Sequence, residues 1–190
     1  MSLDASWAHL FNPGVERVRL EVSELGVMAM GEVEERVGPS LLRLHYTILC
    51  DPDWNVKEIM VDRHSPQTGS VDLIGDGMGK WYNAACQEIP SLEGCTEVDL
   101  SASAFTNTIP IRKLDLAVDQ KAELKVVYLD ARSMQPKSST QRYTCVKRLP
   151  NESVYYYEGL DTGFRVQLRV DSDGLVMDYP GVFRRNDLIH

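Results

Sequence analysis

The residues best suited to chemistry lie in two neighbouring stretches near the middle of this 190-residue chain. Glu97 and Asp99 in the first stretch, and Asn107 and Arg112 in the second, stand among residues apolar enough to be buried. A buried charge is tolerated when it is paired and hydrogen-bonded, so we expect Arg112 to find Asp99 or Asp178. Two interpretations are open at this point. One is a structural polar network that fixes how the strands cross, made of Glu97, Asp99, Arg112 and Asp178, and the other is a ligand site into which Asn107 and Arg112 point.

Other motifs predict turns rather than sites. The glycine-rich segment 75–80 lacks the four residues that a phosphate loop needs before its Gly-Lys pair, and Trp81 replaces the required Ser or Thr. Asp171 and Asp173 precede a glycine as in a calcium loop, but the bidentate glutamate is missing. No histidine pairs with a carboxylate at helical spacing, and the four cysteines form no C-x-x-C. We therefore expect no metal, no cofactor and no disulfide framework, and we assign no catalytic residue.

We expect β-strands to position these residues, because hydrophobicity along the chain has a period of two. Val18, Leu20 and Val22 alternate with charged residues, which is typical of a half-buried strand. The segment 42–50 alternates in the same way. Further strands are expected at 27–37, 56–63, 70–74, 95–101, 109–116, 122–128, 141–147, 154–157, 164–170 and 175–179.

Helical periodicity is almost absent. The one candidate helix is 4–11, where Trp7, Leu10 and Phe11 fall at helical spacing, and the turn-rich segment 132–140 predicts a mobile hairpin loop. We therefore predict an all-β chain with at most one or two short helices. Its roughly ten to twelve strands should form a single curled antiparallel β-roll or partly closed barrel, in one domain spanning 1–190.

Composition excludes several classes of function. The chain has 28 acidic and 20 basic side chains, a net charge of −8, and no basic cluster longer than a pair. Nucleic-acid binding and attraction to anionic membranes both depend on basic groups, so neither is expected. No run of eighteen apolar residues predicts a transmembrane segment, and the N-terminus lacks the pattern of a signal peptide. We expect a cytoplasmic protein with reduced cysteines.

The central stretches also resemble a known family. Glu93-Gly94-Cys95, Val98-Asp99-Leu100 and the run from Phe105 to Leu114 are similar to the signature of the bacterial family named putative glycolipid-binding, formerly a domain of unknown function. Further matching pieces include Tyr46-Thr47-Ile48, Asp51 with Trp54, the segment 76–81, Gln141-Arg142-Tyr143 and the segment 175–181. The resemblance spans about residues 15–184. The family's usual Asp, Thr-Pro and second Arg are replaced here by Glu97, Ser103-Ala104 and Lys113.

This resemblance implies a β-roll similar to that of lipoprotein carriers, and with it a binding protein. In this hypothesis the concave face of the curved sheet holds a lipid or glycolipid in an apolar cavity. The residues expected to contact the ligand are Trp54, Trp81, Asp99, Asn107 and Arg112. The competing structural outcome is a roll filled by its own side chains.

Two alternatives belong to other classes of protein. The first is a cytosolic hydrolase or isomerase that uses Asp99, Arg112 and Asp178 as acid and base groups. The second is a structural module without a ligand, which assembles into a homodimer or larger homo-oligomer through an exposed sheet edge.

Overall fold

One large sheet runs through residues 1–186, which are the residues that the computed structural model describes. Its fourteen strands are β1 (Ser2–His9), β2 (Gly14–Ser23), β3 (Gly26–Val37), β4 (Ser40–Cys50), β5 (Val56–Ser65), β6 (Gly69–Gly75), β7 (Trp81–Asn83), β8 (Glu97–Leu100), β9 (Lys121–Asp130), β10 (Gln135–Arg148), β11 (Glu152–Gly159), β12 (Phe164–Asp171), β13 (Val176–Tyr179) and β14 (Phe183–Arg185). Their order in the sheet is β7-β6-β5-β4-β3-β2-β1-β14-β13-β12-β11-β10-β9-β8. The two edge strands, β7 and β8, do not pair with each other, so the predicted curled all-β sheet is confirmed and it is not closed.

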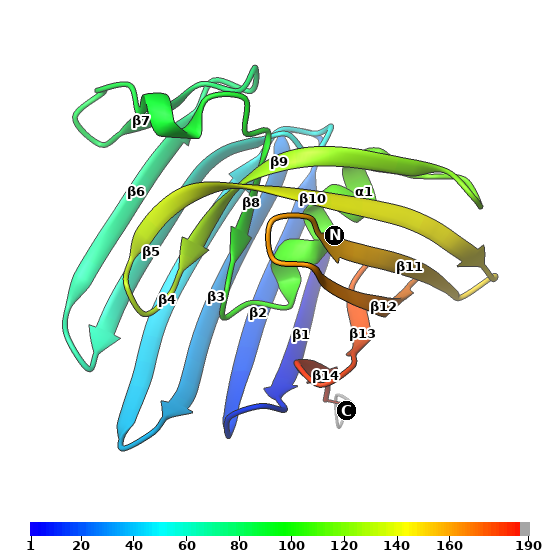
Figure 1. The fold of residues 1–190 in the computed structure, drawn as a ribbon, viewed down its shortest axis with the longest axis horizontal. Coiled ribbons are helices and arrows are strands. Elements are labelled where there is room, and N and C mark those ends of the chain that lie inside the picture. Colours follow the sequence, from blue (N-terminus) through cyan, green and yellow to red (C-terminus); the bar gives the residue numbers. More distant parts are fainter. Residues whose placement is uncertain (187–190) are drawn as a thin grey trace.

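The sheet curls so that its two ends form two facing walls. The wall of β1 to β6 is crossed by β9 to β12, and a short helical segment lies between them (Figure 1). That segment consists of η2 (Phe105–Asn107) and α1 (Thr108–Leu114), and a further short turn of helix, η1 (Pro90–Leu92), lies near β7. All neighbouring strands are antiparallel except β8 and β9, which are parallel.

The alternation of side chains decides which face of each strand looks into the curl. On β2, Val18 and Leu20 are buried while Arg17 and Arg19 are exposed. Because successive side chains point to opposite faces of a strand, the apolar set of every long strand gathers on the concave side. The core therefore lies inside the curl, and the outer face carries the charges.

The predicted strand 109–116 is wrong, because most of this segment belongs to α1, which directly follows η2. Phe105 and Ile109 are four residues apart, so they share one face of the helical segment, and both are buried. Pro110 lies in the first turn of α1, where its missing N–H has no helical partner to lose. The helix ends at Asp115, whose left-handed backbone (φ 39°) lets its N–H reach the carbonyl of Ile111 at 3.2 Å.

The predicted helix 4–11 is also wrong, because β1 occupies most of it. Ala5 and Trp7 are buried two residues apart, as a strand requires, whereas Leu10 and Phe11 lie exposed in the turn that follows. The indole N–H of Trp7 donates to the carbonyl oxygen of Val176 at 2.6 Å, which anchors β1 in the core.

The predicted loop 132–140 is shorter than expected. The turn between β9 and β10 covers only 131–134, and β10 already begins at Gln135. Pro136 is accommodated within this strand, which pairs with β9 through the register Pro136 to Leu129.

Candidate functional site

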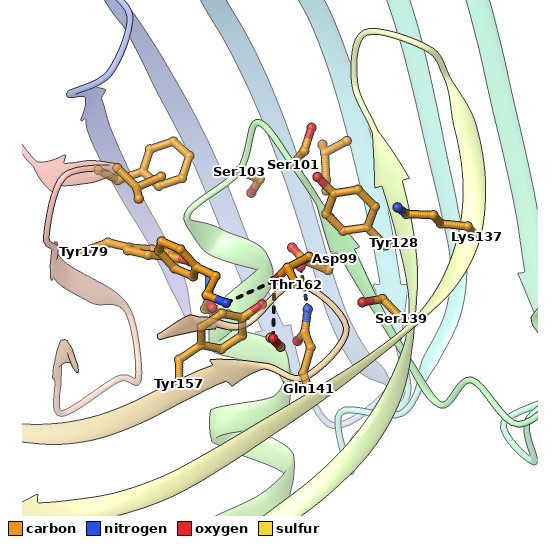
Figure 2. A pocket seen from close by; sticks show the side chains of 16 residues that line it. Asp99, Ser101, Ser103, Tyr128, Lys137, Ser139, Gln141, Tyr157, Thr162 and Tyr179 are labelled. Carbon is orange, nitrogen blue, oxygen red and sulfur yellow. Dashed lines mark hydrogen bonds between the residues drawn. The ribbon is translucent and has the colours of Figure 1, made fainter. Parts of the chain in front are cut away.

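A cavity of about 240 Å³ opens on the concave side of the curl. Its walls come from β8, the segment leading into η2, the hairpin of β9 and β10, the turn from β11 to β12, and the turn from β13 to β14. Figure 2 shows its side chains converging from these separate elements on a space around Asp99. Most of the interior of the roll is filled by core side chains, so the cavity is a small recess beside that core.

Asp99 on β8 is the one carboxylate among the described residues that line the cavity. Its Oδ2 accepts a hydrogen bond from the Gln141 amide at 2.6 Å, and its Oδ1 accepts one from the Thr106 hydroxyl at 3.2 Å. Burial raises the pKa of Asp99 above its ordinary value, and these two hydrogen bonds oppose the rise. The carboxylate is thus held in a fixed orientation, with lone pairs left for a further donor.

A second polar group comes from the helical segment. The Tyr143 hydroxyl on β10 donates to Oδ1 of Asn107 at 3.0 Å, and the Asn107 amide donates to the carbonyl of Ala104 at 3.3 Å. Asn107 lines the cavity and is almost fully buried. Its orientation is therefore set by partners on two different elements.

Aromatic rings form a further part of the cavity wall. Tyr157, Phe164, Tyr179 and Phe183 all line it, with centroid separations of 6.2 Å from Tyr157 to Phe164, 6.1 Å from Phe164 to Tyr179 and 5.9 Å from Tyr179 to Phe183. These separations are typical of packed aromatic pairs. Phe164 remains 42% exposed, so the aromatic wall continues from the cavity to the outer surface.

The floor of the cavity includes Ser103, which precedes η2. Ser103 contacts Glu16, a fully buried carboxylate of β2 that also accepts the Tyr46 hydroxyl at 2.6 Å. Burial raises the pKa of Glu16 to about 7, against hydrogen bonds that lower it. The segment carrying the cavity floor is thus tied to the wall formed by β2 and β4.

The predicted polar network does not form. Arg112 pairs with no carboxylate in residues 1–186; its guanidinium lies over the ring of Trp54, 5.3 Å from the centroid. Asp178 lies 3.6 Å from Arg184, and Glu97 pairs with Lys113 instead. The physical reason is the helical backbone, which turns Arg112 away from the side on which Asn107 faces the cavity.

The structure therefore brings together only part of the predicted ligand set. Asp99 and Asn107 share the cavity, whereas Arg112, Trp54 and Trp81 do not line it. Trp81 is buried, and its indole N–H donates to the carbonyl of Cys95 at 2.8 Å, as expected of a core tryptophan. Trp54 is also buried in the core.

Several residues that line the cavity were not predicted from the sequence as ligand contacts. They are Ser103, Gln141, Tyr157, Phe164 and Tyr179. Gln141 and Tyr143 alternate with less buried residues on β10, so the period of two already placed both on the inner face. Glu16 carried a similar signal, since it shares the inward positions of Val18 and Leu20 on β2.

Two further kinds of site find no support in the described part of the chain. Residues 1–186 contain no group of three His, Cys, Asp or Glu side chains arranged to hold a metal ion. None of the helices described there is long and apolar enough to cross a membrane.

Comparison with known proteins identifies the family. The family model described as "Putative glycolipid-binding" matches residues 4–185. The chain belongs to this family. A crystal structure of a DUF1089 family protein from Pseudomonas aeruginosa is 33% identical, covers 90% of this chain and 92% of that one, and superposes with a TM-score of 0.79.

A second solved structure supports only the fold of this chain. It is a beta-barrel-like protein of a domain of unknown function, DUF1849, from Brucella abortus. It is 13% identical, covers 96% of this chain and 92% of that one, and has a TM-score of 0.59. No protein with a curated description matches the sequence.

Proposed function

We propose that this protein binds a glycolipid by taking the sugar head into the cavity around Asp99. The observation that carries the proposal is the pairing of an oriented carboxylate and amide, Asp99 and Gln141, with an aromatic wall across the same small cavity. Sugar hydroxyls donate to carboxylates and bond to amides, and the C–H faces of a sugar ring pack on aromatic rings. The family description agrees with this chemistry.

The size of the cavity determines which part of the ligand can enter. At about 240 Å³ it lies below the roughly 300–1,000 Å³ typical of sites that enclose a drug-sized ligand. A sugar head is the better match for such a space with polar groups on one side. This revises the expectation of an apolar cavity that encloses an acyl chain, because the core side chains occupy most of the interior.

Binding of octyl glucoside, below the concentration at which it forms micelles, tests the proposal by isothermal titration calorimetry. We expect Asp99→Ala to weaken binding about tenfold to a hundredfold, because hydrogen bonds to charged groups contribute about 1.5–3 kcal/mol. Asp62→Asn, on the exposed face of β5, is the matched control and should leave affinity unchanged.

Octanoic acid, which has a chain of similar length without a sugar, is the comparison ligand. If octanoic acid binds as tightly as octyl glucoside, or if neither binds, recognition of the sugar head is refuted. The same refutation follows if Asp99→Ala folds and binds octyl glucoside with unchanged affinity.

The tail of the ligand should leave the cavity across Phe164, because this ring lines the cavity and is still partly exposed. Each buried CH₂ contributes about 0.8 kcal/mol, so dodecyl maltoside should bind more tightly than its octyl counterpart. We expect Phe164→Ser to remove most of that chain-length gain, measured as the ratio of the two affinities, even though loss of the ring from the aromatic wall also weakens binding of the octyl compound. Leu25→Ser removes an apolar side chain at a more exposed position, on the turn between β2 and β3, and should keep the gain. An unchanged gain in Phe164→Ser would contradict this path.

A further inference from the structure

Four turns at one end of the sheet contain no charged side chain. They join β1 to β2, β3 to β4, β5 to β6 and β13 to β14, and they comprise residues 10–13, 38–39, 66–68 and 180–182. Because these strands are antiparallel and His9 pairs with Phe183, all four turns lie at the same end. The first three follow the lower edge of the wall formed by β1 to β6 (Figure 1). We call these four turns the neutral rim.

The opposite end of the same wall is acidic. Each turn that connects β2 to β3, β4 to β5 and β6 to β7 contains an aspartate or glutamate; these turns are 24–25, 51–55 and 76–80. The large apolar residues exposed there stand beside acids. Leu25 follows Glu24, and the backbone N–H of Met78 donates to the Asp76 carboxylate at 2.7 Å. Because charges are costly to move from water into lipid, only the neutral rim is suited to enter an apolar layer.

Phe11 projects from the neutral rim with 86% of its surface exposed, next to Leu10, which is 41% exposed. The polar side chain of the same turn is held on the protein, because the Asn12 amide donates to Oε1 of the buried Glu35 at 2.6 Å. The turn therefore presents an aromatic ring to the outside while its amide is already bonded. Exposed apolar surface of this kind marks sites of contact with other proteins or with membranes.

The backbone of the neutral rim is also suited to a layer without water. Each of its four turns contains a proline, which has no N–H to leave unpaired: Pro13, Pro39, Pro66 and Pro180. Beside Phe11, the N–H of Leu10 donates to the carbonyl of Val182 at 2.8 Å, and the N–H of Val182 donates to the carbonyl of Tyr179 at 2.9 Å. Unpaired backbone groups are costly in lipid, so these features lower the cost of insertion.

Three arginines stand next to the neutral rim, and they are Arg36, Arg63 and Arg132. The backbone N–H of Arg36 donates to the carbonyl of Pro13 at 2.8 Å, and the guanidinium of Arg63 donates to the carbonyl of Arg132. Arg132 lies 3.8 Å from Glu35, yet 57% of its side chain remains exposed. Guanidinium groups bind phosphate well. Apolar tips with arginines behind them match a bilayer, in which the phosphates lie outside the acyl chains.

We propose that the neutral rim docks on a bilayer of zwitterionic lipid, with Phe11 and Leu10 among the acyl chains and the arginines at the level of the phosphates. A bilayer fits this end better than a second copy of the chain does, because its large apolar side chains project from short turns, whereas a stable protein interface buries a broad area. The net charge of −8 does not oppose docking on a surface without net charge.

Docking would bring the cavity to the membrane surface. Val182 belongs to the neutral rim and also lines the cavity, as does Phe183, whose ring lies 4.8 Å from that of His9 at the end of β1. A ligand could thus pass between bilayer and cavity along this edge. This consequence for ligand transfer rests on the proposed function, whereas docking itself does not.

Co-sedimentation with sucrose-loaded vesicles of phosphatidylcholine alone tests the docking. Wild type should pellet with the vesicles, and Phe11→Ser should lower the partition coefficient about tenfold to a hundredfold, as expected for the loss of one buried phenylalanine side chain. Leu25→Ser is the matched control: it removes a side chain that is 93% exposed at the acidic end, and it should pellet like wild type. Both variants should fold, because the replaced side chains are exposed.

Three results would overturn the proposal. They are a wild type that stays in the supernatant at millimolar lipid, a Phe11→Ser variant that pellets like wild type, and a Leu25→Ser variant that loses as much binding as Phe11→Ser. Sedimentation velocity without lipid tests the competing occupant. A dimer that Phe11→Ser dissociates would assign the neutral rim to a second copy of the chain and would also overturn docking on a bilayer.

Fluorescence gives a readout of insertion that weak adsorption would not produce. The native tryptophans are buried, so their emission should change little on vesicles. The indole introduced by Phe11→Trp should shift to shorter wavelength and be quenched by phosphatidylcholine that carries bromine on its acyl chains. Leu25→Trp should show neither change. Equal quenching in the two variants would contradict insertion of the neutral rim.

The proposed function and the docking fail separately. Asp99→Ala should bind vesicles like wild type, because Asp99 lies in the cavity, and Phe11→Ser should bind monomeric octyl glucoside like wild type, because Phe11 does not line the cavity. Vesicle binding without affinity for octyl glucoside would refute the proposed function and leave docking intact. Affinity for octyl glucoside without vesicle binding would refute docking alone.

Discussion

Gly31→Ala should lower the free energy of unfolding by about 3 kcal/mol, at the upper end of the usual cost of overpacking a core. Gly31 on β3 pairs in register with Tyr46 on β4, and a Cβ at position 31 would lie 2.0 Å from Cζ of the Tyr46 ring. The ring is buried, and its hydroxyl is bonded to Glu16, so it cannot move aside without breaking that contact. Urea unfolding at constant pH measures the effect.

The matched control is Gly69→Ala on β6. A Cβ there would have the Nη2 atom of Arg63 as its nearest neighbour, 3.5 Å away, which is an ordinary contact with a flexible side chain. We expect a change within about 0.5 kcal/mol. If Gly31→Ala is as stable as Gly69→Ala, the Tyr46 ring does not hold the position on which the contact with Glu16 depends.

The same glycine illustrates what the sequence could and could not predict. Period-two alternation identified β2, β3 and β4, and with them the all-β class and the curl of the sheet, because each long strand carries its own apolar face. The close approach of Tyr46 to Gly31 depends on the register between two strands. That register is fixed by the turn at residues 38–39, which joins the two strands, and by the match of their buried faces, rather than by the period of two within either strand.

The site was harder to predict because its contacts are distant in sequence. Asp99 and Gln141 are 42 residues apart, and Ser103 and Glu16 are 87 residues apart. Asp99 was singled out from its polar character in an apolar stretch, but Arg112 was expected to pair with either Asp99 or Asp178. That expectation failed because segment 109–116 was predicted as a strand in an otherwise all-β chain, whereas most of it forms a helical turn that directs Arg112 away from the cavity.

Stability should decrease as the pH rises from 5 to 8, in contrast to proteins whose buried carboxylates are stabilised as anions. Burial raises the pKa of both Glu16 and Glu97 to about 7. For each group, the folded state keeps a proton that the unfolded state loses above pH 4.5. The resulting stabilisation is complete below pH 4.5 and is lost as the pH rises to 7, by about 3 kcal/mol per group.

Glu97 contributes to this loss even though it has a cationic partner. Its Oε1 contacts the ammonium of Lys113, but its Oε2 has no hydrogen-bond partner and the side chain is only 2% exposed. Lys113 therefore compensates only one oxygen of Glu97, and the cost of removing the charged carboxylate from water exceeds the attraction within the ion pair.

His9 changes stability in the opposite direction. Burial lowers the pKa of His9 below 6.5, so the stabilisation that it contributes is present above pH 6.5 and is lost as the pH falls.

Urea unfolding at pH 5, 6, 7 and 8 separates these contributions. Wild type should lose several kcal/mol between pH 5 and pH 8, whereas Glu97→Gln and Glu16→Gln should each remove about half of the loss and the double variant nearly all of it. Glu24→Gln, exposed in the turn after β2, should behave like wild type. A wild-type stability that is flat or rises over this range would show that both carboxyl groups are already ionised inside the folded protein.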